Sequence, residues 1–97
     1  MKRERKIFSG RSNPELAKKI ADSADCQLGD ISIKTFSDGE IWVKYEENVR
    51  GQDVFIIQST NGPSENIIEL ALMTDAAVRA SASTVNICLL YTSDAAD

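Results

Sequence analysis

Three apolar stretches along the chain predict buried strands. The run "VFII" at 54–57 is apolar at every position, which is typical of a strand covered on both faces in a parallel sheet. The stretch at 84–90 is mostly apolar as well, and a shorter one at 6–10 ends at a glycine. We expect a strand at each of these three places.

A helix is predicted after the first strand. Asn13 can cap its start, Pro14 fits the first helical position, where no amide donor is required, and Glu15 complements the helix dipole. Apolar residues then recur at helical spacing, and this stripe predicts the packed face. Its members are Leu16, Ala17, Ile20, Ala21 and Ala24.

The segment between this helix and the strand at 54–57 alternates apolar and polar residues, which predicts a β-hairpin. Its arms are expected at 31–37 and 40–46. Asp38 and Gly39 lie between them, and an Asp-Gly pair is among the strongest short-range hairpin signals.

A two-residue turn would fix the pairing of the two arms. Phe36 would lie opposite Ile41, and Thr35 opposite Trp42. One face would then carry Phe36, Ile41, Val43 and Tyr45, and the other Ile31, Ile33 and Trp42. Large apolar groups on both faces exceed what one small core uses, so we expect the hairpin to meet a partner surface.

A second helix is predicted from about Ser64 to Ser81, and it is apolar over a wide arc. The residues of this arc are Ile67, Ile68, Leu70, Ala71, Leu72, Thr74 and Ala76. The resulting order of strand, helix, hairpin, strand, helix and strand predicts an α/β domain with right-handed crossovers.

Composition argues against several classes of function. The 97 residues are 42% apolar with a net charge of −4 and scattered basic residues, so we expect no nucleic-acid partner. No apolar stretch approaches the roughly 18–20 residues that span a bilayer, so we expect no membrane partner. The absence of histidine removes the usual general base and metal ligand. Two cysteines without a pairing pattern indicate a reducing compartment.

The residues suggest phosphate contacts at two kinds of position. The loop at 58–62 leaves a buried strand at its carboxyl end and leads to a helix, where backbone amides attract anions. It contains neither a dinucleotide fingerprint nor a P-loop, so an ordinary connection is the favoured interpretation. Arg50 and Arg79 offer guanidinium groups to phosphate, but an ordinary solvent-exposed residue is the favoured interpretation of each.

The residues around the predicted turn form another candidate. The ring of Phe36 can stack on a planar base while the carboxylates of Asp38 and Glu40 accept hydrogen bonds from an amine. An Asp-Gly pair also forms a turn with no further role, and from local pattern alone this simpler interpretation is the default.

The end of the chain differs from the rest. Residues 91–97 show neither helical nor strand periodicity, and the run "CLLYTSDAAD" from Cys88 resembles translated sequencing-adapter read-through. We therefore expect residues 1–87 to be an incomplete N-terminal domain and residues 88–97 to be a non-native tail.

Four stretches resemble the N-terminal part of the ribose-phosphate pyrophosphokinase family, also called phosphoribosyl pyrophosphate synthetases. They are "KIFSGRSNPELAKKIA", "FSDGEIWV", "ENVRGQDVFIIQST" and "NIIELALMTDAAVRASAS". Their combination and order are highly specific, and they span only the first part of such an enzyme. The resemblance implies a truncated, phosphoribosyltransferase-like (Rossmann-like) α/β domain with a β-hairpin insertion.

The resemblance also implies an activity. The family transfers the diphosphoryl group of ATP to ribose 5-phosphate with Mg²⁺, forming phosphoribosyl pyrophosphate and AMP for nucleotide biosynthesis, and its cytoplasmic subunits assemble into dimers and hexamers. Such transfer relies on positioning and on cations that offset charge. The family's catalytic loops and metal-binding histidine would lie beyond Asp97. We therefore expect no catalytic or metal-binding residue in these 97 residues, and no activity from them alone.

Two sites follow from the resemblance, residue by residue. In the family, the hairpin with the FSDGE motif reaches across a subunit interface and contacts the adenine of ATP bound by the neighbour. The matching residues are Phe36, Asp38 and Glu40. A regulatory phosphate or nucleotide site uses the "VRG" turn and the "ASAS" segment. The matching residues there are Asn48, which stands where many relatives have serine, Arg50 and Ser81.

Two other interpretations remain open at this point. A non-catalytic regulatory protein associated with the synthetase would share this N-terminal architecture, and the sequence after Ile87 would separate it from the enzyme. A generic binding module with the phosphoribosyltransferase fold would make no adenine contact at Phe36.

Overall fold

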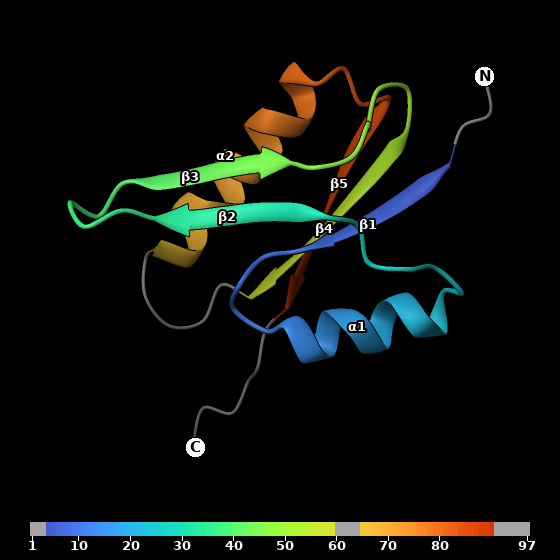
Figure 1. The fold of residues 1–97 in the computed structure, drawn as a ribbon. Helices are drawn as coiled ribbons and strands as arrows, with labels where there is room; N and C mark the ends of the chain where they lie inside the picture. The colour runs from blue at the N-terminus through green and yellow to red at the C-terminus, as the bar shows by residue number, and fades with distance from the viewer. Residues whose placement is uncertain (1–3, 60–64, 91–97) are drawn as a thin grey trace.

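The computed structural model describes residues 4–59 and 65–90 of the chain. Its elements follow the order that the sequence predicts (Figure 1). They are β1 (Arg5–Ser9), α1 (Pro14–Ser23), β2 (Ile31–Thr35), β3 (Ile41–Tyr45), β4 (Asp53–Ser59), α2 (Glu65–Arg79) and β5 (Thr84–Leu90). Residues 91–97, which make up most of the predicted tail, lie outside the described residues.

The three predicted strands form one parallel sheet in the order β1-β4-β5. Val54 and Ile56 in the central strand β4 are fully buried, and Ile57 is 2% exposed, so the prediction of a strand covered on both faces is confirmed. Val54 and Ile56 pack in the cluster that includes α2 and the hairpin, whereas Ile57 packs with α1. The two helices therefore cover opposite faces of the sheet.

Helix α1 begins as predicted. The side chain of Asn13 accepts a hydrogen bond from the Leu16 N–H at 3.2 Å, and Pro14 occupies the first turn. Ala17 and Ala21 are buried against the sheet. Small residues on this face let the helix approach the sheet closely.

Helix α2 is the predicted second helix, and its most buried residues lie on one stripe. Its buried residues are Glu69, Met73 and Ala77, while Ile67 and Ile68 are 54% and 51% exposed. Of the residues in the apolar arc, Leu70 packs against the core, whereas Ile67 and Ile68 do not. An α-helix that is apolar almost all round does not indicate its buried face by hydrophobicity alone, and here the buried stripe begins with a carboxylate.

The register of the hairpin also corrects the prediction. Thr35 lies opposite Ile41, whereas a two-residue turn would have paired Phe36 with Ile41 and Thr35 with Trp42. The turn instead takes three residues and ends at Gly39, whose φ of +91° lies in the left-handed region. A three-residue turn closed by a left-handed glycine is the next most common hairpin solution, and an Asp-Gly pair suits both.

A shift of one residue moves every side chain of one arm to the other face. In the observed register, the face toward α2 and the core carries Ile31, Ile33, Thr35, Ile41, Val43 and Tyr45. The outer face is polar apart from two exposed rings, Phe36 at 48% and Trp42 at 39% exposure. The expectation of two apolar faces is therefore wrong.

Tyr45 fixes the hairpin to the core. Its ring packs edge-on against Phe8, with centroids 4.7 Å apart and planes at 84°. Its hydroxyl donates a hydrogen bond to the Met73 carbonyl at 2.8 Å. Burial raises the pKa of this hydroxyl well above its usual value, so it remains a donor throughout the physiological pH range.

Replacing Gly39 tests the left-handed turn. Gly39→Ala should lower the free energy of unfolding by about 1 kcal/mol, because a Cβ strains the backbone at this φ although nothing lies within 4 Å of it. Gly39→Asn is the matched control and should cost less, since asparagine tolerates this conformation. Urea unfolding of the chain measures both. Equal effects of the two variants would contradict the proposed turn geometry.

Candidate functional site

The turn of the hairpin carries the three residues expected to contact adenine. Phe36, Asp38 and Glu40 are all exposed. The Phe36 carbonyl accepts the Gly39 N–H at 2.8 Å, and Asp38 Oδ1 accepts the Glu40 N–H at 3.0 Å. The hairpin tip, residues 36–40, therefore presents one ring and two carboxylates on a hydrogen-bonded turn.

The hairpin tip projects away from the sheet (Figure 1). The pairing of Phe36 with Glu40 continues the alternation of the arms and places both on the outer face with Trp42. The Lys34 ammonium lies over the Trp42 ring, 5.2 Å from its centroid. Two aromatic rings with charged neighbours thus remain exposed on one side of the ribbon.

The structure brings together the second predicted set, Asn48, Arg50 and Ser81. The Gly51 N–H donates to the Ser81 carbonyl at 2.9 Å, and Asn48 Oδ1 accepts the Arg50 N–H at 3.0 Å. Gly51 and Ser81 both have left-handed φ values, 74° and 67°. These two turns meet at the amino ends of β4 and β5, which is the opposite edge of the sheet from the carboxyl ends.

Two weaker candidates from the sequence are now placed. Arg79 pairs with Asp75 at 2.8 Å, and both side chains are more than half exposed, so the pair contributes little. Gln58 and Ser59, expected to begin a loop, instead form the buried end of β4. The rest of that loop lies outside the described residues.

Sequence reasoning missed a buried polar network at the carboxyl end of β4. Glu69 is 2% exposed, and its carboxylate accepts hydrogen bonds from the Arg11 backbone N–H at 2.7 Å, Arg11 Nε at 2.8 Å and Gln58 Nε2 at 3.1 Å. The Ser12 hydroxyl donates to Gln58 Oε1 at 2.6 Å and accepts the Ser59 N–H at 2.8 Å. A carboxylate this deeply buried is tolerated because several donors, one of them charged, satisfy it.

The position of Glu69 in this network could have been predicted from the sequence. Glu69 precedes Met73 and Ala77 at four-residue spacing, so one helical stripe contains all three. The contact of Arg11 with Glu69 could not have been predicted, because the two residues are 58 positions apart and only the folded topology brings them together.

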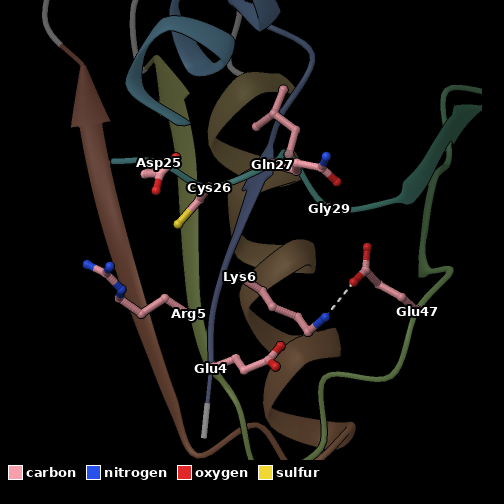
Figure 2. A pocket seen from close by; sticks show the side chains of 9 residues that line it. Glu4, Arg5, Lys6, Asp25, Cys26, Gln27, Gly29 and Glu47 are labelled. Atoms are coloured by element: carbon pink, nitrogen blue, oxygen red, sulfur yellow. Dashed lines mark hydrogen bonds and ion pairs between the residues drawn. The ribbon is translucent and has the colours of Figure 1, made fainter. Parts of the chain in front are cut away.

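A pocket of about 510 Å³ lies beside the amino end of β1, at the opposite end of the sheet from the buried polar network (Figure 2). Lys6 Nζ reaches Glu47 Oε1 there at 2.7 Å, and the Asp30 N–H donates to Glu47 Oε2 at 2.6 Å. The hydrogen bonds from Lys6 and Asp30 lower the pKa of Glu47, and the hydrogen bond to Glu47 raises the pKa of Lys6. These bonds join β1 to both segments that flank the hairpin.

Within the described ranges, no three acidic, cysteine or histidine side chains lie together in a way that would hold a metal ion. The Mg²⁺ expected from the resemblance therefore finds no ligand set among these residues. No helix in the same ranges is long and apolar enough to cross a membrane.

The fold and the candidate site define a class of protein. A parallel three-stranded sheet with helices on both faces and an inserted hairpin is a Rossmann-like α/β domain. The chain belongs to the ribose-phosphate pyrophosphokinase family, because the family model for the N-terminal domain of that enzyme matches residues 5–95. The predicted fold class and the resemblance are confirmed.

Individual relatives agree with this assignment. Ribose-phosphate pyrophosphokinases from Fusobacterium nucleatum and Bacillus subtilis are 55% and 56% identical to the chain over 87 residues, which is 89% of its length. A crystal structure of phosphoribosylpyrophosphate synthetase from Mycobacterium smegmatis aligns over 90% of the chain with a TM-score of 0.79 and 34% identity. The chain spans only 27–30% of the length of these relatives.

The Lys6–Glu47 pair predicts a pH dependence of stability. The pKa of Glu47 is lowered from 4.5 in the folded state, so its contribution is present above pH 4.5 and is lost as the pH falls through the folded pKa. At neutral pH, Glu47→Gln should lower the free energy of unfolding by less than about 1 kcal/mol, since the pair is partly exposed. Urea unfolding should show this difference shrinking in acid. A difference that stays constant down to about pH 3 would contradict the proposed role.

Proposed function

We propose that the full-length protein containing this chain transfers the diphosphoryl group of ATP to ribose 5-phosphate, forming phosphoribosyl pyrophosphate and AMP. Family membership and identities of 55% and 56% to ribose-phosphate pyrophosphokinases support this reaction. The observation that carries the proposal to this chain is the FSDGE motif, whose ring and two carboxylates are exposed at a projecting hairpin tip.

The hairpin tip would hold the adenine of ATP. The exposed ring of Phe36 suits stacking on a base, and the carboxylates of Asp38 and Glu40 suit the exocyclic amine, which is a donor. The same carboxylates would repel phosphate groups. We therefore propose that the tip binds the adenine base and that other parts of the full-length protein bind the phosphates of ATP.

A second copy of the protein would supply the rest of this site. The tip projects away from the three-stranded sheet, Phe36 is exposed on the tip, and Trp42 is exposed next to it. Ile67 and Ile68 on α2 add exposed apolar surface. Assembly into dimers, and dimers into hexamers, would cover surface of this kind.

The turns around Gly51 and Ser81 would form a regulatory phosphate or nucleotide site. Arg50 and the Ser81 hydroxyl can donate to phosphate, and the Gly51–Ser81 hydrogen bond holds their turns together. Asn48 Oδ1 accepts the Arg50 N–H. We therefore propose that Asn48 stabilises the turn and does not itself contact the phosphate.

Mg²⁺ would be held by the nucleotide phosphates and by groups beyond the described residues, since these contain no ligand cluster. When bound, it supplies neutralisation of the charge on the transferred group. The contribution of this chain would be to orient the base.

The 97-residue chain alone should be inactive. It would contain the adenine contact and lack the parts that bind ribose 5-phosphate and the metal. A coupled assay for AMP formation from ATP, ribose 5-phosphate and Mg²⁺ measures this. Turnover by the isolated chain would show that the catalytic groups lie within these residues and would contradict the division of roles proposed above.

A chimera tests the adenine contact. Residues 5–87 would replace the matching segment of the Bacillus subtilis enzyme, to which the chain is 56% identical. In this chimera, Phe36→Ala should raise the KM for ATP by about 5- to 150-fold, which corresponds to the ~1–3 kcal/mol of a base–aromatic stack. The KM for ribose 5-phosphate should change little.

Lys44→Gln is the matched control for this chimera, because Lys44 is an exposed residue of the same hairpin, farther from the tip. It should leave both KM values unchanged. An active chimera in which Phe36→Ala leaves the KM for ATP unaltered would favour a generic binding module and exclude the proposed stack.

A further inference from the structure

The buried network at the carboxyl end of β4 reaches the hairpin through one residue. Arg11 Nη2 donates to the Thr35 hydroxyl at 2.8 Å, while Nε and the backbone N–H of Arg11 bind Glu69. Arg11 therefore connects the loop after β1, the helix α2 and the outer end of β2. Thr35 directly precedes Phe36, the first residue of the hairpin tip.

The inner end of this connection is firmly held. The Glu69 side chain is 3% exposed, and Gln58 Nε2 binds both its carboxylate and the Asn66 carbonyl. The loop before Arg11 lies directly against Gln58, because a Cβ on Gly10 would come within 2.1 Å of Gln58 Oε1. Arg11 thus extends from a buried anchor whose position is fixed on several sides.

The outer part of the hairpin needs such support. A two-stranded ribbon is marginal by itself, so its order depends on what it packs against. Apolar packing against the main core includes Ile31, Ile33, Val43 and Tyr45. The Thr35–Ile41 pair follows outward from Ile33 and Val43, and the bond from Arg11 is made at this pair, next to the turn.

We propose that Arg11 is a positioning residue that holds the hairpin tip in one orientation by binding Thr35 from the Glu69 anchor. Arginine suits this role because its planar fork can serve a carboxylate with one nitrogen and a hydroxyl with another, which a lysine ammonium on a flexible stem does not reproduce. The benefit for adenine binding rests on the proposed function, whereas the effect on the tip does not.

Amide hydrogen exchange of the 97-residue chain, followed by NMR, tests the positioning directly. Thr35→Val removes the hydroxyl and keeps the branched shape. It should speed exchange of the Phe36 and Gly39 N–H groups about 3- to 10-fold, since their bonds close the turn, and leave β4 unchanged. Arg11→Lys should act in the same way. Thr35→Ser restores the hydroxyl and should return exchange to the original rate.

Thr74→Val is the matched control, because its hydroxyl donates to the Leu70 carbonyl within α2 at 2.9 Å. It should leave exchange at the tip unchanged. Unaltered exchange in both Thr35→Val and Arg11→Lys would overturn the proposal. Equal acceleration of exchange in the tip and β4 would overturn it as well, because that result means general destabilisation.

The chimera separates this inference from the proposed function. Thr35→Val should raise the KM for ATP about 3- to 10-fold with kcat nearly unchanged, and Thr35→Ser should reverse the effect. If Phe36→Ala raises the KM for ATP and Thr35→Val does not, the positioning role is wrong and the adenine contact stands. If neither changes the KM while exchange at the tip still accelerates, Arg11 positions the tip and the adenine contact is wrong.

Discussion

The three-residue turn of the hairpin is the constraint on which the candidate site depends. Strand side chains alternate with a period of two, so the length of the turn decides which residues of each arm face the core. With Gly39 closing the turn, Tyr45 faces inward onto Phe8 while Phe36 remains outside. A two-residue turn would place Phe36 and Tyr45 on the same face. The ring of the motif would then compete for the core and be lost to any ligand.

The hairpin is supported at both ends by different kinds of interaction. Near the sheet, Tyr45 combines a ring contact with a hydrogen bond to α2. Near the tip, Arg11 reaches Thr35 from the buried carboxylate of Glu69. Burying a charge is costly, and an apolar residue would often give more stability, so the network is better explained by the orientation it enforces. The strands of the parallel sheet then act as a fixed base from which the hairpin projects.

Local and periodic features were predictable from the sequence. The uninterrupted apolar run of β4, the Asn13-Pro14 helix start and the Asp-Gly turn each reflect short-range physics, and each lies where it was expected. The register was not predictable, because the same dipeptide suits turns of two and three residues. The buried face of α2 was hidden by a helix that is apolar on most sides.

Part of the candidate site was likewise predictable from the sequence, and part was not. The motif itself indicated Phe36, Asp38 and Glu40, but neither pattern nor spacing could show that Arg11 and Glu69 support them, since that contact exists only after the sheet has formed.

Isotope-edited NMR of the chain tests the central constraint most directly. The observed register makes Thr35 and Ile41 a directly opposed, non-hydrogen-bonded pair, so a strong contact between their Hα atoms is predicted. A strong contact between the Hα atoms of Phe36 and Ile41 instead, which would be the non-hydrogen-bonded pair next to a two-residue turn, would contradict the account.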